Sequence, residues 1–160
     1  VIEYARNCAG LKEASSEEFD EKSNSSEDHL IYHLSKWIKD QKVEIRSKVQ
    51  NKGGTMRLGA YPAKIKKGTM AYSIYKKAIV SERHRHRFEV NVNYQEALEN
   101  NGLTFSGFSQ DGSLPEVVEL STHPFFLGVQ FHPELKSKPF EPHPIFSNFI
   151  KKALEQTRLV

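Results

Sequence analysis

The stretch FFLGVQFHPE, residues 125–134, joins an apolar run to a rigid polar end. Residues 125–131 favour a strand, because they are rich in aromatic and β-branched side chains. Pro133 has a fixed backbone angle and restricts the residue before it to an extended conformation, so His132 is held at the end of this strand. Glu134 can then fold back to one ring nitrogen of His132 and leave the other nitrogen able to transfer a proton. The stretch therefore fits two-thirds of a catalytic triad, although the spacing alone favours a buried histidine beside a strand end with a surface glutamate.

The composition is that of an ordinary single domain. The chain has 160 residues, of which 38% are hydrophobic and 27% charged. A formal net charge of +3 is too small to indicate a polyanionic partner. The one cysteine excludes an internal disulfide and favours a reducing compartment. No apolar stretch approaches the roughly 20 residues of a membrane helix, and no signal peptide is recognisable, so we expect a cytoplasmic protein without a membrane partner.

The first residues have the pattern of a helix without a beginning. Val1, Tyr4, Ala5 and Cys8 form one helical stripe, and Gly10 follows as a left-handed cap. No capping residue and no initiator methionine precede them, which favours a chain cut from a longer one. We expect Cys8 to be a small apolar residue on the buried stripe.

The rest of the chain mixes helical and strand patterns, so the predicted class is α/β with a β-rich middle. A serine- and acid-rich stretch predicts a flexible loop at about 20–29. The expected helices cover residues 30–38, 93–102 and 143–156, and the expected strands cover residues 43–49, 55–61, 82–91, 103–109, 117–120 and 125–131. We expect the phenylalanines of the last strand and helix to be in the core, namely Phe125, Phe126, Phe146 and Phe149.

The string ERHRHR invites a functional interpretation. In an extended chain Arg83, Arg85 and Arg87 lie on one side, and His84 and His86 lie on the other. The two histidines supply only two metal ligands, and no Cys-x-x-Cys or His-Glu-x-x-His motif accompanies them, so we predict no metal site. We favour structural or interdomain contacts for Arg83 and Arg85. A basic RNA-binding domain would rest on this string alone, and it lacks the aromatic stacking pattern of such domains.

Four strings together resemble the glutamine amidotransferase domain of the CTP synthase family. They are ASSEEF at 14–19, GGTMRLG at 53–59, ERHRHRFEVN at 82–91 and GVQFHPE at 128–134, in that family's order and approximate spacing. The resemblance covers nearly all of the chain and implies a flavodoxin-like sheet flanked by helices, with a β-rich insertion around residues 45–90. It also implies that residues 1–160 are the C-terminal portion of one such domain, incomplete at its N-terminus.

The resemblance implies a glutaminase activity. In that family a cysteine in a Gly-x-Cys-x-Gly-x-Gln turn attacks the carboxamide of L-glutamine and forms a glutamyl thioester, while a histidine and a glutamate matching His132 and Glu134 move and orient the proton. The ammonia passes to a synthetase domain of the same polypeptide, which uses ATP and Mg²⁺ to convert UTP into CTP, with GTP as activator. Homo-oligomerisation would run through that domain. No cofactor is expected in this segment, and no nucleic-acid partner.

Further residue roles follow from the resemblance. Arg87 matches an arginine that pairs with the α-carboxylate of glutamine, and Glu18 matches an acid that receives its α-ammonium group. Without the resemblance, Glu18 would be interpreted as a solvated loop acid, whereas for Arg87 the spacing alone is equally compatible with a strand-surface cation. In that family the regions of Arg46 and Arg57 lie toward the place where GTP stimulates glutamine use, so the resemblance makes these two arginines candidates for that coupling.

The nucleophile has no match in this sequence. Cys8 lies at the C-terminal end of its helix rather than in a glycine-flanked turn, so it cannot replace the family's cysteine. We expect the 160 residues alone not to hydrolyse glutamine. A competing interpretation is a catalytically dead amidotransferase-like module with a regulatory or interaction role.

Overall fold

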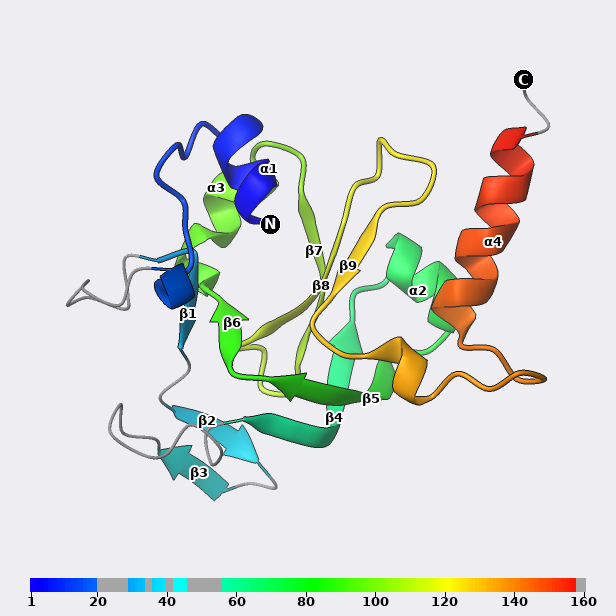
Figure 1. Cartoon of the computed structure of the whole chain (residues 1–160), viewed down its shortest axis with the longest axis horizontal. Helices are drawn as coiled ribbons and strands as arrows, with labels where there is room; N and C mark the ends of the chain where they lie inside the picture. The colour runs from blue at the N-terminus through cyan, green and yellow to red at the C-terminus, as the bar shows by residue number, and fades with distance from the viewer. Residues whose placement is uncertain (20–28, 34–35, 40–41, 46–55, 158–160) are drawn as a thin grey trace.

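A computed structural model describes residues 1–19, 29–33, 36–39, 42–45 and 56–157 (Figure 1). Arg46 and most of the loop predicted at 20–29 lie outside the described residues. The α-helices are α1 (Ile2–Asn7), α2 (Met70–Tyr75), α3 (Gln95–Glu99) and α4 (Pro144–Thr157). The 3₁₀ turns are η1 (Glu17–Phe19), η4 (Val92–Tyr94) and η5 (Pro133–Leu135). The strands are β1 (Ile31–His33), β2 (Lys36–Lys39), β3 (Lys42–Ile45), β4 (Arg57–Ile65), β5 (Ile79–His86), β6 (Phe88–Val90), β7 (Thr104–Ser109), β8 (Pro115–Glu119) and β9 (Leu127–Val129).

A five-stranded antiparallel sheet, in the order β5-β4-β7-β8-β9, organises the described part of the chain. Its longest pairing joins β4 and β5, from Arg57 opposite His86 to Lys64 opposite Ile79. Inward and outward side chains alternate along β5, as the period-two pattern of its sequence predicts. Two small antiparallel pairs, β1 with β6 and β2 with β3, accompany this sheet.

Two hydrophobic clusters pack against the sheet. Phe105, Leu98 and Leu103 centre one cluster, which also includes Ala5 of α1. Phe131, Val117 and Ile65 centre the other, which includes residues of α2 and α4. In Figure 1, α1 and α3 accordingly lie on one side of β7 and β8, and α2 and α4 lie on the other. The structure thus has helices flanking a sheet, as the α/β prediction requires.

The helix predicted over residues 30–38 is wrong. Ile31–His33 is a strand that pairs with β6, and Lys36–Lys39 is a strand that pairs with β3. The apolar residues here fit a short helical stripe, but β6 and β3 offer backbone partners that a local pattern cannot reveal. Pairing between distant segments therefore overrides a weak local preference.

The strand bounds differ from their predictions where the chain bends. The extended stretch 82–91 is two strands, β5 and β6, separated at Arg87. The strand predicted at 125–131 is reduced to Leu127–Val129, although the Gln130 amide still donates to the Glu116 carbonyl at 3.0 Å. The short helix α2 was not predicted; Thr69 caps its first turn by accepting a hydrogen bond from the Tyr72 amide at 3.2 Å.

The placements expected for Cys8 and three phenylalanines are also wrong. Helix α1 ends at Asn7, and the Ala9 amide bonds back to the Tyr4 carbonyl at 3.1 Å, so the buried stripe continues into Ala9 and leaves Cys8 exposed. Gly10 has the predicted left-handed φ of +72°. Helix α4 buries only Ile145, so Phe146 and Phe149 are exposed, as is Phe126. Phe125 is partly buried against the second cluster.

Within the described residues, no helix combines the length and the apolar character that crossing a bilayer requires. Residues 57–90 are rich in strands, in line with the predicted β-rich region.

The pairing of β7 with β8 depends on the absence of a side chain at Gly107. The register shifts on both sides of this residue. A Cβ atom there would lie 2.7 Å from Val117 Cγ2 and 3.2 Å from Ile65 Cδ1. Neither neighbour can withdraw easily, because both belong to the second cluster.

We predict that Gly107→Ala lowers the free energy of unfolding of the full chain by about 1–3 kcal/mol, because the added methyl group overpacks the sheet. Urea denaturation measures the change. Lys64→Ala on the neighbouring strand is the control; its side chain is exposed, so we expect a change within about 0.5 kcal/mol. Equal effects of the two substitutions would contradict the inference that the pairing of β7 with β8 requires a glycine at position 107.

Candidate active site

Backbone geometry holds His132 at the point where the sheet ends. Pro133 opens the turn η5, and His132 takes the cap position with φ −110° and ψ 89°. The His132 amide donates to the Arg83 carbonyl at 2.8 Å, which ties the segment after β9 to β5. The histidine backbone is therefore fixed both by its own sequence and by a distant strand.

The structure brings His132 and Glu134 together. His132 Nδ1 lies 2.7 Å from Glu134 Oε1. A hydrogen bond from its own backbone amide, and one from His132, lower the pKa of the Glu134 carboxyl. A carboxylate only accepts, so Nδ1 carries the proton and Nε2 is the basic nitrogen. The His132 side chain is 40% exposed.

Glu82 anchors the segment that follows His132. This glutamate of β5 is buried; its Oε1 accepts from Tyr75 Oη at 3.1 Å and lies 3.0 Å from His143 Nε2, while Lys136 Nζ lies 3.3 Å from Oε2. Lys136 Nζ also donates to the Ser81 carbonyl. Burial by itself would raise the pKa of Glu82, but the bonds to His143 and the charge of Lys136 outweigh it and lower that pKa. One buried carboxylate thus holds both ends of the stretch 136–143.

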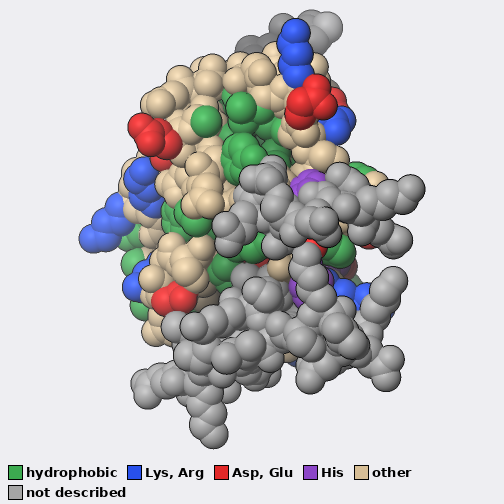
Figure 2. All heavy atoms as spheres, turned by 90° about the vertical axis from the view of Figure 1, so that its left-hand side faces the viewer, with side chains coloured by type: hydrophobic (Ala, Val, Ile, Leu, Met, Phe, Trp, Pro, Cys, Tyr) green, Lys and Arg blue, Asp and Glu red, His purple; other side chains and the backbone are tan. Residues whose placement is uncertain are grey.

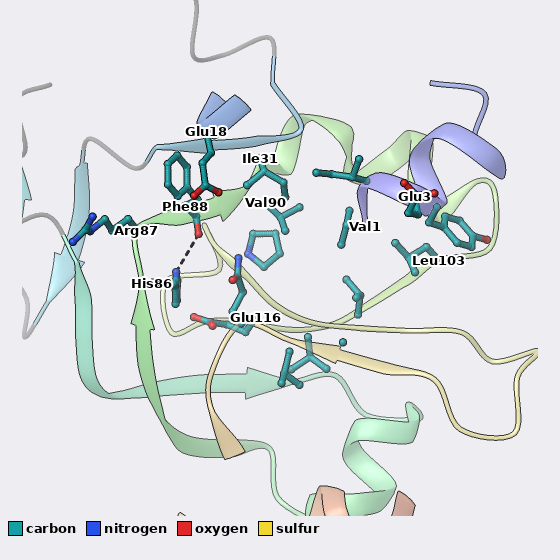
Figure 3. Close-up of a pocket in the computed structure, with 18 of the residues that line it drawn as sticks. Val1, Glu3, Glu18, Ile31, His86, Arg87, Phe88, Val90, Leu103 and Glu116 are labelled. Atoms are coloured by element: carbon teal, nitrogen blue, oxygen red, sulfur yellow. Dashed lines mark hydrogen bonds between the residues drawn. The ribbon is translucent and has the colours of Figure 1, made fainter. Parts of the chain in front are cut away.

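Glu18 and Arg87 line one cavity of about 770 Å³, together with Glu116 and Gln130. In the close-up the Glu18 carboxylate is directed toward the cavity, while the Arg87 side chain extends away from its centre (Figure 3). His132 and Glu134 are not among the residues that line it. Glu18 and Arg87 therefore share a cavity from which the His132–Glu134 pair is set apart, although Gln130, two residues before His132, borders it.

Arg57 is not placed to contact an effector directly. It is 3% exposed, and its guanidinium contacts Glu89 Oε1 at 3.3 Å and Glu116 Oε1 at 2.5 Å. Burial by itself would lower the pKa of Arg57, but these two carboxylates outweigh it and raise that pKa. Arg57 therefore forms ion pairs in the interior of the protein.

The two histidines of ERHRHR contact each other. His84 Nδ1 lies 2.9 Å from His86 Nε2, while Arg83 and Arg85 are exposed as the alternation predicts. In the described part of the chain, no group of three or more His, Cys, Asp or Glu side chains is arranged to hold a metal ion. On the face shown in Figure 2, acidic and basic side chains are dispersed among hydrophobic and polar ones.

Four buried acids were not predicted from the sequence, namely Glu82, Glu89, Glu116 and Glu119. A signal was available, because Glu116 and Glu119 interrupt the otherwise apolar stretch LPEVVEL. An acid within a buried strand needs a partner. For Glu119 the partners are the Met70 and Ala71 amides at the start of α2, at 2.7 Å and 3.0 Å.

Comparisons with known proteins agree on the kind of domain. A family model described as glutamine amidotransferase class-I matches residues 8–152. CTP synthases of Cereibacter sphaeroides and Zymomonas mobilis are 56% and 57% identical to this chain over 161 and 159 residues, or 100% and 99% of it. The chain spans 29% and 28% of the length of these two relatives.

A solved structure agrees with the sequence relatives. The glutaminase domain of the Trypanosoma brucei CTP synthase, determined with bound acivicin, superposes with a TM-score of 0.77 at 37% identity. The match covers 97% of this chain and 56% of that chain. This likeness agrees with the flavodoxin-like fold expected from the sequence.

The pKa shift of Glu82 predicts a pH-dependent contribution to stability. Because the folded pKa lies below the ordinary value of 4.5, the contribution is complete above that value and is lost as the pH falls through the folded pKa. We predict that Glu82→Gln lowers the free energy of unfolding by about 2 kcal/mol at pH 7, and by progressively less below about pH 4.5. Chemical denaturation between pH 7 and 4 measures the difference.

Glu141→Gln is the matched control for Glu82, because Glu141 pairs with Lys138 at the surface. We expect it to leave the free energy of unfolding nearly unchanged at any pH, because solvent screens an exposed ion pair. A Glu82→Gln effect that is independent of pH would mean that its carboxylate charge does not stabilise the fold.

Proposed function

The chain belongs to the class-I glutamine amidotransferases, and we propose that it supplies the proton-transfer pair of the glutaminase site in a CTP synthase. The observation that carries the proposal is the 2.7 Å contact of His132 with Glu134. The high identity to CTP synthases across the whole chain supports the choice within the family. The proposed substrate is L-glutamine, and the products are glutamate and ammonia.

His132 is proposed to move the proton at its Nε2 atom. In the first step Nε2 accepts the proton of a cysteine thiol while the sulfur bonds to the carboxamide carbon of glutamine. The same proton then passes to the leaving nitrogen as the carbon–nitrogen bond breaks, which releases ammonia and leaves a glutamyl thioester. Water, deprotonated by Nε2, hydrolyses the thioester and regenerates the thiol. Glu134 keeps the ring in the required tautomer and stabilises the imidazolium between steps.

Cys8 is not proposed as the nucleophile. It lies at the C-terminal end of α1, where the helix dipole disfavours a thiolate. In Figure 1, α1 is far from the turn after β9 that carries His132. The proposed mechanism therefore needs a cysteine other than Cys8, and the 160 residues alone are proposed to be inactive toward glutamine.

Glu18 and Arg87 are proposed to bind the α-ammonium and α-carboxylate groups of glutamine. Their common cavity and opposite charges support the assignment. The Arg87 side chain must turn inward for this contact, because it extends away from the cavity centre (Figure 3). A planar guanidinium suits a carboxylate through two parallel hydrogen bonds.

The function of the parent protein is proposed from its relatives. Ammonia released at this site would be used by a synthetase domain of the same polypeptide to convert UTP into CTP. That domain would consume ATP and bind Mg²⁺, and GTP would act as activator. Oligomerisation is proposed to run through that domain. A dead amidotransferase-like module is the alternative, and assays of glutamine-dependent activity distinguish the two.

We predict that His132→Ala in the full-length protein lowers glutamine-dependent CTP formation by about 10²–10⁴-fold, since a general base is removed. Ammonia-dependent CTP formation persists. His123→Ala and Cys8→Ser are controls at exposed positions, and both keep the activity. Coupled assays with glutamine or ammonium chloride measure the rates. Full glutamine-dependent activity of His132→Ala, or its abolition by Cys8→Ser, would refute the assignment.

We predict that Arg87→Ala raises the KM for glutamine by about 10-fold or more, because a charged hydrogen-bond partner of the substrate is lost. The rate with ammonia stays the same. Arg83→Ala, which removes an exposed arginine of the same string, is the control and leaves the KM unchanged. Parallel loss of the glutamine and ammonia activities would assign Arg87 a structural role instead.

A further inference from the structure

Three ionisable side chains meet in the interior of the protein. Arg57 of β4 lies between two buried glutamates, Glu89 of β6 and Glu116 of β8. All three are at most 3% exposed. The Arg57 guanidinium also lies 4.6 Å from the centre of the Tyr61 ring. One cation thus faces two carboxylates without bulk water.

Two histidines extend this cluster in a row. His86 Nδ1 lies 3.1 Å from the Phe88 carbonyl, as Figure 3 shows, and 3.4 Å from Glu89 Oε1. His86 Nε2 lies 2.9 Å from His84 Nδ1. At the other end of the row, His84 Nε2 lies 3.5 Å from Glu116 Oε2. Each of the four ring nitrogens therefore faces a definite neighbour.

The protons of this row can be assigned from one end to the other. The Phe88 carbonyl can only accept, so Nδ1 of His86 carries a proton. If His86 is neutral, its Nε2 accepts, and the proton between the rings belongs to His84 Nδ1. A neutral His84 then has a bare Nε2 that faces Glu116 Oε2. Neither of these two atoms has a hydrogen-bond partner within the described residues.

Two neutral imidazoles supply two protons, but the row contains three contacts that each need one. An ionised Glu116 beside a neutral His84 would leave two acceptors facing each other, both fully buried. That arrangement is costly, because buried lone pairs need donors. One further proton between His84 Nε2 and Glu116 Oε2 satisfies both atoms.

The charges of the three groups are in line with this conclusion. Arg57 contributes one positive charge, and ionised Glu89 and Glu116 would contribute two negative charges. For these three groups the further proton makes the sum zero. An uncompensated buried charge is strongly unfavourable.

Glu89 is the glutamate that stays ionised. Its carboxylate oxygens face three donors, namely Arg57 Nη1, His86 Nδ1, and Gln130 Nε2 at 3.4 Å. A group that accepts from three sides has no need of a proton. The two glutamates on the same arginine are thus assigned opposite protonation states.

The cluster also holds the segment that carries His132. The Gln130 amide donates to the Glu116 carbonyl, and the Gln130 side chain donates to Glu89. The Phe131 ring contacts the His84 ring edge-on, with centroids 5.9 Å apart. The His132 amide donates to the carbonyl of Arg83, the residue before His84. Three consecutive residues are therefore fixed by the strands in which the cluster lies.

We propose that His84 and Glu116 share one buried proton, and that the neutral cluster it completes positions the segment 130–132, and with it His132. The proton assignment stands on the contacts alone. The positioning role rests on the proposed glutaminase function. His84, Glu89 and Glu116 are positioning residues, since none of them is proposed to touch the reacting atoms.

The electrostatic surroundings agree with a proton on the glutamate. Burial raises the pKa of Glu116 to about 7, against the opposing charge of Arg57 and with a small contribution from Asp111. Burial, assisted by Arg57, His86 and His132, lowers the pKa of His84 to about 2. For Glu116 the folded pKa lies above the ordinary value, so its stabilising effect is present at low pH and is lost as the pH rises through about 7.

Substitution of the two glutamates by glutamine tests the proton assignment in the full-length protein. The amide introduced by Glu116→Gln has an NH₂ donor for His84 Nε2 and an oxygen acceptor for Arg57, so this variant should shift the melting temperature by less than about 4 °C at pH 7. Glu89→Gln places an NH₂ group among donors and should lower the melting temperature by about 10 °C or more. A similar loss for both variants would overturn the shared proton.

Infrared spectroscopy provides a direct readout. The wild type at pH 6 should show the stretching band of a protonated carboxylic acid that is shielded from solvent exchange, and Glu116→Gln should lack it. Persistence of the band in Glu116→Gln would place the proton elsewhere and overturn the assignment.

The pH dependence of glutamine use tests the positioning role. The ratio of the wild-type to the Glu116→Gln glutamine-dependent kcat should fall as the pH rises above about 7, because only the wild type loses the shared proton. Titrations common to both proteins cancel in this ratio. The ammonia-dependent rate should give a constant ratio. A constant ratio with glutamine would overturn the positioning role and leave the proton assignment to the thermal and infrared results.

Failure of the proposed function would give a different pattern. If His132→Ala keeps full glutamine-dependent activity, the glutaminase assignment fails and the positioning role fails with it. The melting temperatures and the infrared band still decide the shared proton, because neither measurement depends on catalysis.

Discussion

The buried guanidinium of Arg57 is the constraint on which much of this structure depends. Arg57 comes from β4, and its glutamate partners come from β6 and β8, so the contacts of one cation link three strands that do not pair with one another. Buried charges require close partners with good geometry. The histidine row from β5 adds a fourth strand to the same cluster. The sheet is thereby fixed by polar contacts as well as by the apolar clusters on its two faces.

The segment carrying His132 is fixed by contacts of two kinds. Pro133 restricts the backbone locally. Backbone hydrogen bonds from the Gln130 amide to the Glu116 carbonyl and from the His132 amide to the Arg83 carbonyl attach the segment to β8 and β5. Beyond it, Glu82 holds Lys136 and His143. A base that must meet a reacting atom at hydrogen-bond distance benefits from such attachment, because small displacements are costly in rate. The partly exposed imidazole of His132 is thus attached to a backbone segment that several contacts hold in place.

The local patterns predicted much of the fold correctly. The strand at 104–109, the last helix from Pro144 and the left-handed Gly10 all agree with the sequence patterns, since each depends on residues close in the chain. The failures lie where distant partners decide. Residues 30–38 form strands because β6 and β3 pair with them, and the apolar side chains of α4 are exposed because only its first turn is buried. Local periodicity contains no information about either outcome.

For the site, the sequence by itself determined the family and the restricted backbone of the His-Pro-Glu string, because a proline fixes its own backbone angle and limits that of the residue before it. The contact of His132 with Glu134 was one of two outcomes that this string allowed, and the structure decided it. Only the tertiary structure decided that Arg57 is an internal ion-pair partner, that Glu18 and Arg87 share a cavity, and that Glu82 and Glu116 support the segment of His132. These groups are separated by up to 98 positions in the chain, from Glu18 to Glu116. Their protonation and contacts depend on which distant strands exclude water around them, and a linear pattern does not encode that exclusion.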